Sequence, residues 1–317
     1  ARVFISPNEI EPSDDLAPVG DGVTHQASFV ARRTALRADP LNPVFINWAS
    51  LSNRYETADL YPNNHIEVNG ALRELRTLGV QVLAQITVSQ SRFPIGDTND
   101  WAGRWELWQH CYAQAFHLGR EFDVQRYQMF NEPNHSNAGG LAISAFLLRL
   151  QLASDAFQSA LADVNRLYSK SLQPRILAPV TAGTADGAYP GWGEAVLTNR
   201  HRNFLGQPDT NFGLIHLYDY HQYGTSPSGF GGDLSSLRSQ LAAGMAPEAP
   251  FPVTLSEFNV HTGADFDTLP ETLDTPAKYS RFGAIAVNLV ENSINELYAF
   301  KFSQTERTGA YPVQKNA

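Results

Sequence analysis

Two glutamates in the sequence stand directly after short runs of apolar residues. Glu132 follows the run Arg126–Asn131, and Glu257 follows the run Pro252–Ser256. Runs of this kind predict β-strands, and two strands can hold two carboxyl groups at a fixed spacing. Cleavage of a glycosidic bond needs such a pair. One carboxyl group protonates the departing oxygen, while the other attacks the anomeric carbon or activates water.

The residues around Glu132 fit the same chemistry. Pro133 should restrict the backbone of Glu132 to an extended conformation and end the strand there. Asn131 supplies an amide for a sugar 2-hydroxyl group, a contact that strengthens in the transition state. His135 is a further candidate for a substrate contact, and its alternative role is to cap the following turn.

The elements that must position these glutamates alternate along the chain. Short apolar runs predict strands, and longer segments with helical spacing lie between them. The predicted strands are Arg2–Ile5, Pro43–Trp48, Val80–Thr87, Arg126–Phe130, Arg175–Pro179, Phe212–Tyr218, Pro252–Ser256 and Glu296–Phe302. The clearest predicted helices are Ile66–Leu78, Trp101–Phe122, Leu141–Tyr168 and Ala277–Glu291.

Eight strands alternating with helices predict an α/β fold, a (β/α)8 TIM barrel that forms one catalytic domain over residues 1–317. In such a barrel the active site lies at the C-terminal ends of the strands, where Glu132 and Glu257 would follow the fourth and seventh strands. After the eighth run only Ser303–Ala317 remains, which Gly and Pro break and which is too short for a closing helix. Either the chain is truncated within that helix, or the strand count is shifted by one.

Composition excludes several classes of partner. A net charge of −9 leaves no basic stripe for nucleic acid and no attraction to an anionic membrane surface. No run of about 18 apolar residues predicts a transmembrane helix. Cys111 is the only cysteine, so neither an internal disulfide nor a zinc site that needs two cysteines of this chain can form. We expect Cys111 to be a small buried hydrophobic residue.

The run Asn131–Asn134 after one strand and Ser256–Phe258 after a later strand, with a segment of histidines and aromatic residues between them, resembles clan A of the glycoside hydrolases. The resemblance covers residues 80–302, most of the chain. It implies a retaining β-glycosidase in which Glu132 is the acid/base and Glu257 is the nucleophile. Their carboxyl groups should lie about 5–5.5 Å apart. Such a mechanism needs no cofactor and no metal.

The clan also implies a His-x-Tyr element near the end of the sixth strand, whose tyrosine bonds the nucleophile. Two placements fit the segment before Gly224: His216 with Tyr218, and His221 with Tyr223. We favour the second because the strand should end near Gly224, at the rim of the pocket. The alternative role of His216 is that of a core histidine that bonds to its neighbours.

Further candidates for substrate contacts are aromatic or polar residues near strand ends, because sugar rings stack on aromatic side chains. They are Trp48, Trp192, Tyr220, Lys301 and Gln304. The clan often has a tryptophan at the end of the eighth strand, where this chain has Lys301 and Gln304. That difference would suit a substituted or anionic sugar.

Two further features of the sequence concern its arginines and its tryptophans. The clan commonly has an arginine near the nucleophile, and both Arg2 and Arg54 are candidates for it. Trp101, Trp105 and Trp108 share one helical face, and we expect them to pack in the core rather than to bind sugar.

Within the clan, Gln128–His135 and Lys301–Ser303 look most like glycoside hydrolase family 86, the β-agarases and β-porphyranases. Family 39, which acts on xylosides and related sugars, is the near competitor. The implied partner is a polysaccharide or oligosaccharide, and a secreted or periplasmic location follows from that substrate class. The chain begins at Ala1 with no signal-peptide pattern, so we expect a mature or excised fragment.

Two alternatives of other classes stay open. A non-catalytic carbohydrate-binding barrel would keep the fold without turnover, and the presence of both carboxylates argues against it. A metal-dependent barrel hydrolase would need a constellation of histidines and carboxylates, and the sparse His and Asp spacing argues against that.

Overall fold

The computed structural model describes residues 1–5, 10–11, 22–58, 67–86, 98–135, 141–183, 189–224, 226–260, 276–299, 306–308 and 311–313. The chain divides into two compact units. The first unit comprises Ala1–Leu177 and Thr198–His216, and the second comprises Ala178–Leu197 and Leu217–Ala317. The prediction of a single domain stays a prediction.

The described strands form a parallel sheet whose order follows the sequence from β1 to β7. These strands are β1 (Arg2–Ile5), β2 (Leu83–Ile86), β3 (Arg126–Gln128), β4 (Arg175–Ala182), β5 (Leu217–Tyr223), β6 (Val253–Asn259) and β7 (Glu296–Ala299). A separate antiparallel pair consists of β8 (Glu306–Thr308) and β9 (Tyr311–Val313). Parallel pairing in chain order confirms the predicted α/β barrel class.

Helices connect and cover these strands. They are α2 (Gln26–Ala38), α3 (Trp48–Thr57), α4 (Val68–Thr77), α5 (Trp101–Phe122), α6 (Ile143–Tyr168), α8 (Glu194–Thr198), α9 (Pro227–Met245) and α10 (Pro276–Glu291). The segment η2 (Tyr189–Gly193), which is kinked at Pro190 and Gly191, precedes α8. Among the described residues, no helix combines the length and the apolar character needed to cross a membrane.

The predicted strand Pro43–Trp48 is wrong. Residues 43–47 form turns and loop, and Trp48 begins α3. The side chain of Asn47 accepts a hydrogen bond from the backbone N–H of Ser50 at 3.1 Å, and this helix cap overrides the strand-like apolar run before it. Glu132 therefore follows the third strand of the sheet, and Glu257 lies in the sixth. The predicted interval of three strands is unchanged.

Two strands of the second unit differ from the predicted bounds. β5 begins at Leu217 rather than Phe212, because residues 212–216 form loop and bends that follow a turn. This turn is closed by a hydrogen bond from the Phe212 N–H to the carbonyl oxygen of Asp209 at 3.1 Å. β6 continues to Asn259, so Glu257 lies within the strand instead of directly after it.

The core of the first unit lies between α5 and α6, which pack against each other. Trp105 and Trp108 are fully buried, and Phe29 of α2 meets their rings edge-on at 5.6 and 6.3 Å. Trp101 lies edge-on to the same phenylalanine at 5.8 Å. The core role predicted for this stripe is confirmed, and Cys111 is buried as expected.

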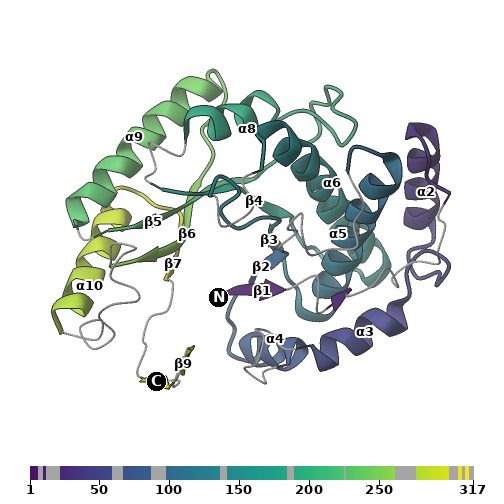
Figure 1. The fold of residues 1–317 in the computed structure, drawn as a ribbon, viewed down its shortest axis with the longest axis horizontal. Helices are drawn as coiled ribbons and strands as arrows, with labels where there is room; N and C mark the ends of the chain where they lie inside the picture. Colours follow the sequence, from purple (N-terminus) through teal and green to yellow (C-terminus); the bar gives the residue numbers. More distant parts are fainter. Residues whose placement is uncertain are drawn as a thin grey trace. The chain divides into compact units, whose positions relative to one another are not determined.

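In the second unit, α9 and α10 lie side by side (Figure 1). Both helices contact β6 through aromatic rings. Phe258 of β6 stacks on Phe282 of α10 at 4.8 Å and meets Phe230 of α9 edge-on at 6.5 Å. Gly231 of α9 permits the close helix contact, because a Cβ atom there would overlap the side chain of Asn288.

A buried carboxylate on α6 connects three elements of the first unit. Asp155 accepts hydrogen bonds from Arg33 Nε at 2.8 Å and Nη2 at 2.9 Å, and from the indole N–H of Trp108 at 2.7 Å. Removal of this carboxylate would leave a guanidinium charge and a buried indole N–H without their acceptor.

We expect Asp155→Ala to lower the free energy of unfolding by about 3 kcal/mol, because one partner of a largely buried ion pair is lost. Chemical denaturation measures the change. Arg73→Gln is the control: it breaks the Arg73–Glu56 pair, whose side chains are 57% and 46% exposed, and should cost less than about 1 kcal/mol. Equal losses in the two variants would contradict the buried network.

Candidate active site

Glu132 lies in the first unit, four residues after Gln128 ends β3. Its φ of +48° is in the left-handed region, which costs an ordinary residue about 1–2 kcal/mol. The predicted extended conformation before Pro133 is therefore wrong. A hydrogen bond from the His135 N–H to the Glu132 carbonyl oxygen at 2.9 Å, and another from the Leu141 N–H to the Pro133 carbonyl oxygen at 3.3 Å, hold this turn. Backbone strain of this kind clusters at functional sites.

Arg2 of β1 connects the first strand to the end of β3. Its Nε donates to Gln128 Oε1 and its Nη2 donates to Asn131 Oδ1, both at 2.9 Å. Asn131 is thereby oriented directly before Glu132. The sequence predicted Arg2 or Arg54 as an arginine near the nucleophile. Arg2 lies close to Glu132, the expected acid/base, and Arg54 lies in the last turn of α3, so an arginine beside the nucleophile stays a prediction.

The electrostatic environment of Glu132 favours the protonated carboxyl group. Burial raises the pKa of Glu132 above the ordinary value for glutamate, while the charges of His135 and Arg2 oppose this shift. A raised pKa suits a general acid, which must still carry its proton at the pH of the reaction.

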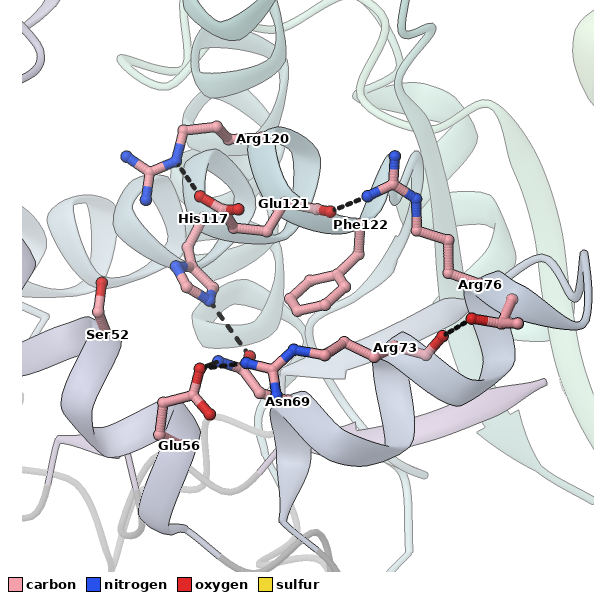
Figure 2. Close-up of a pocket in the computed structure, with 10 residues that line it drawn as sticks. Ser52, Glu56, Asn69, Arg73, Arg76, His117, Arg120, Glu121 and Phe122 are labelled. Atoms are coloured by element: carbon pink, nitrogen blue, oxygen red, sulfur yellow. Dashed lines mark hydrogen bonds and ion pairs between the residues drawn. The ribbon is translucent and has the colours of Figure 1, made fainter.

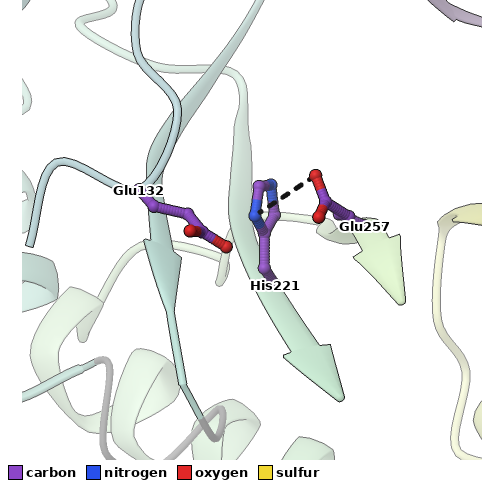
Figure 3. Close-up of side chains that lie close together, drawn as sticks. All are labelled: Glu132, His221 and Glu257. Carbon is purple, nitrogen blue, oxygen red and sulfur yellow. Dashed lines mark ion pairs between the residues drawn. The ribbon is translucent and has the colours of Figure 1, made fainter. Parts of the chain in front are cut away.

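Glu257 lies in the second unit among side chains of β5 (Figure 3). The Tyr223 hydroxyl donates to Glu257 Oε1, and His221 Nδ1 lies 3.8 Å from Glu257 Oε2. Glu257 is 7% exposed and His221 is fully buried. A donor hydroxyl and a neighbouring imidazole orient this carboxylate, as a nucleophile requires.

The two placements of the His-x-Tyr element differ clearly in their contacts. β5 ends at Tyr223, where the favoured placement puts the tyrosine, and this hydroxyl bonds Glu257. Tyr218 is buried against Gly193 instead. His216 Nδ1 accepts a hydrogen bond from the Ile176 N–H at 3.2 Å. Burial, assisted by the charge of Arg175, lowers its pKa to about 4, which keeps this ring neutral.

Sequence reasoning missed two residues beside Glu257. The backbone N–H of Ser256 donates to Asp219 Oδ1 at 3.1 Å, and the Ser256 hydroxyl lies 3.1 Å from His221 Nε2. The available signal was Asp219 itself, a carboxylate between two tyrosines in a strand where nearly every residue is buried.

Two predicted sugar platforms lie in packed surroundings. Tyr220 is fully buried, so its ring offers no open face in the second unit. Trp48 is half-buried at the start of α3, where its Nε1 donates to the Pro40 carbonyl oxygen at 2.9 Å and its ring lies 4.9 Å from that of Phe116. We therefore do not propose Tyr220 or Trp48 as contacts with the sugar.

The remaining predicted contacts are placed differently. Trp192 is half-buried in η2, after β4, and His135 is exposed beyond β3. Lys301 and Gln304 lie outside the described residues.

A separate pocket of about 580 Å³ lies in the first unit (Figure 2). Its lining comes from α3, α4 and the last turns of α5: Ser52, Glu56, Asn69, Arg73, Arg76, Thr77, His117, Arg120, Glu121 and Phe122. Ion pairs join Arg73 to Glu56 and Arg120 to Glu121. Because α5 leads into the start of β3, this pocket lies towards the N-terminal ends of the strands, whereas Glu132 follows the C-terminal end of β3.

The sequence matches no protein-family model and no curated protein sequence. The structure is similar to that of Cel5A (EG2) from Hypocrea jecorina, with a TM-score of 0.51, 15% identity, and coverage of 98% of this chain and 78% of that chain. This likeness shows a shared fold.

Two other solved structures show weaker similarity. One is an endo-β-1,4-glucanase, Xac0029, from Xanthomonas axonopodis pv. citri, with a TM-score of 0.47, 14% identity, and coverage of 98% of this chain and 77% of that chain. The other is a family 39 glycoside hydrolase from Bacteroides cellulosilyticus WH2, with a TM-score of 0.49, 11% identity and coverage of 94% of this chain. The present chain spans half the length of the latter, 50%.

We expect Arg2→Gln to raise the pKa of Glu132 further, because the variant removes a positive charge that lowers it while burial is unchanged. A carbon NMR titration of the Glu132 carboxyl group measures the pKa in both proteins. Arg73→Gln is the control, because it removes the same charge from the separate pocket, and it should leave the pKa of Glu132 unchanged. A lower pKa in Arg2→Gln would contradict this electrostatic account.

Proposed function

We propose that this chain is a retaining glycoside hydrolase that cleaves β-glycosidic bonds in a polysaccharide or oligosaccharide. Glu132 is the acid/base catalyst and Glu257 is the nucleophile. The observation that carries the proposal is the contrast between the two sites. Burial raises the pKa of Glu132, which suits an acid, whereas the Tyr223 hydroxyl donates to Glu257 and orients it, which suits a nucleophile.

The proposed reaction has two steps. Glu132 gives its proton to the glycosidic oxygen while Glu257 attacks the anomeric carbon, which releases the leaving group and forms a covalent glycosyl-enzyme. Water then attacks the anomeric carbon and loses its proton to Glu132, and Glu257 leaves as a carboxylate. Two inversions retain the anomeric configuration. Asn131, held by Arg2, bonds the sugar 2-hydroxyl group.

This mechanism requires residues 1–317 to act as one catalytic domain, with the two carboxyl groups about 5–5.5 Å apart during the reaction. In a (β/α)8 barrel the C-terminal ends of the strands surround one active site, so the barrel class is what supports this requirement. The mechanism uses no metal and no cofactor, so a chelator should leave activity intact.

For the substrate, we propose a β-linked polysaccharide such as the marine galactans agarose or porphyran. The support is the run Gln128–His135, which resembles family 86. A β-xyloside, as for family 39, is the alternative. Trp192 and His135 are the proposed additional contacts with the sugar. A polysaccharide substrate also favours a secreted or periplasmic enzyme.

We expect Glu257→Ala to abolish hydrolysis of the best substrate among agarose, porphyran, xylan and mixed-linkage glucan, because no group remains to attack the anomeric carbon. Binding of that substrate, measured by calorimetry, should persist. Glu194→Ala changes an exposed glutamate of α8 and serves as the control with normal turnover. Full activity in Glu257→Ala would exclude the proposed nucleophile, and wild-type binding without turnover would favour a carbohydrate-binding barrel.

We expect the first product released by the wild-type enzyme to be the β-anomer, since double displacement retains configuration. Proton NMR during the first minutes of hydrolysis measures the anomeric signals before they equilibrate. Glu132→Ala should slow hydrolysis of unactivated glycosides by about 10²–10⁴-fold, the contribution of a general acid. An α-anomer would contradict the mechanism and indicate carboxyl groups roughly 9 Å apart with inversion.

A further inference from the structure

We propose that Asp219 positions the nucleophile by holding a β-bulge in β6, and that this bulge turns Glu257 towards His221 and Tyr223. In this role Asp219 is a positioning residue that acts through the backbone of Ser256. The inference rests on the function proposed above, and it names a residue on which the reactive geometry of Glu257 depends.

The bulge is visible in the pairing of β6 with β5. Tyr220 pairs with Leu255, but the next residue of β5, His221, pairs with Glu257. Ser256 is therefore an extra residue of β6 that the strand register with β5 skips. An inserted residue of this kind defines a β-bulge, and bulges are frequent beside active sites, where they redirect a side chain.

The other neighbour of β6 shows the same insertion independently. Leu255 pairs with Leu297 of β7, and Phe258 pairs with Ala299. Two residues of β6, 256 and 257, thus stand opposite a single residue of β7. The register with β5 and the register with β7 both shift after Leu255, so the extra residue lies in β6 and not in a neighbouring strand.

The consequence for Glu257 follows from the alternation of side chains. Without the extra residue, Ser256 would pair with His221, and Glu257 would pair with Gln222. Gln222 faces away from His221, and its side chain donates to Asp233 of α9 at 2.6 Å. A shift of one residue moves every later side chain to the opposite face. A regular β6 would therefore turn Glu257 towards the side of the sheet that α9 covers.

Asp219 provides a hydrogen-bond acceptor for the backbone N–H at the bulge. The backbone N–H of the inserted residue, Ser256, falls outside the regular ladder and needs another acceptor. Asp219 Oδ1 accepts it at 3.1 Å. Asp219 is 0% and Ser256 is 1% exposed, so solvent cannot replace this bond. A carboxylate forms a stronger hydrogen bond with an amide than a neutral acceptor does.

The side chain of Ser256 also makes a contact that fixes the bulge. The Ser256 hydroxyl lies 3.1 Å from His221 Nε2, while Nδ1 of the same ring lies 3.8 Å from Glu257 Oε2. Two residues of β5 therefore contact the inserted serine: Asp219 bonds its backbone amide, and His221 lies at its hydroxyl. Burial of a carboxylate in a central strand is costly, and a role in positioning the nucleophile accounts for its presence.

The test compares two substitutions of Asp219. Asp219→Ala removes the acceptor, whereas Asp219→Asn keeps an oxygen that can still bond the Ser256 N–H. We expect Asp219→Ala to slow formation of the glycosyl-enzyme by about 10²-fold, as misplacement of a reacting group by about 1 Å does. Asp219→Asn should recover most of that loss. Rapid mixing with an activated aryl β-glycoside measures this step, and calorimetry should show unchanged oligosaccharide binding.

Thr254→Val is the matched control, because it removes a buried hydroxyl from the same strand without touching Ser256. Its glycosylation rate should stay within about twofold of the wild type. Amide hydrogen exchange adds a readout that does not need turnover: the Ser256 N–H should exchange faster in Asp219→Ala. Should that variant not fold, Asp219→Ser gives the same comparison, since its hydroxyl is too short to reach the amide.

The outcomes separate the two proposals. The positioning role would be overturned if Asp219→Ala had the wild-type glycosylation rate, or if Asp219→Asn and Asp219→Ala lost equal amounts of that rate. Neither result would contradict the proposed glycoside hydrolase function. A wild-type protein that forms no glycosyl-enzyme with any substrate would overturn the proposed function and the positioning role together. Slow glycosylation with normal binding in Asp219→Ala alone supports the inference.

Discussion

The pairing register of the parallel strands is the constraint on which the candidate active site depends. Side chains alternate between the faces of a strand, so the register decides which of them meet. In the second unit, His221 and Tyr223 share a face of β5, and Glu257 reaches them through one extra residue in β6. In the first unit, the pairing of β1, β2 and β3 brings Arg2 within hydrogen-bonding distance of Asn131.

Sequence periodicity predicted the elements that depend on local pattern. β1 and α5 have the predicted bounds, because an apolar run or a continuous helical stripe defines them without help from the rest of the chain. The apolar run before Trp48 misled the prediction, because the single side chain of Asn47 converts its end into a helix cap. The bulge in β6 depends on a hydrogen bond between two residues 37 positions apart, Asp219 and Ser256, which no local pattern encodes. The left-handed backbone of Glu132 belongs to a turn after β3, where the residue before a proline was expected to be extended.

The environment of Glu132 balances two opposing demands of the proposed mechanism. A double-displacement enzyme uses one group first as an acid and later as a base. Burial alone would favour the proton in both steps, which would weaken the base. Arg2 and His135 carry charges that limit this shift, and both lie close to Glu132. The same arginine orients Asn131, so one side chain adjusts the proton affinity and arranges a neighbouring amide.

The extra residue in β6 also bears on how this protein relates to others by descent. Loss of a single codon at Ser256 would leave the composition of the strand and its pairing partners nearly unchanged. The carboxylate would nevertheless turn to the opposite face of the sheet. An alignment without a gap at this point would likewise match Glu257 to a residue of the wrong face. A variant that lost Ser256 would thus keep Glu257 in its sequence while its carboxylate faced away from His221.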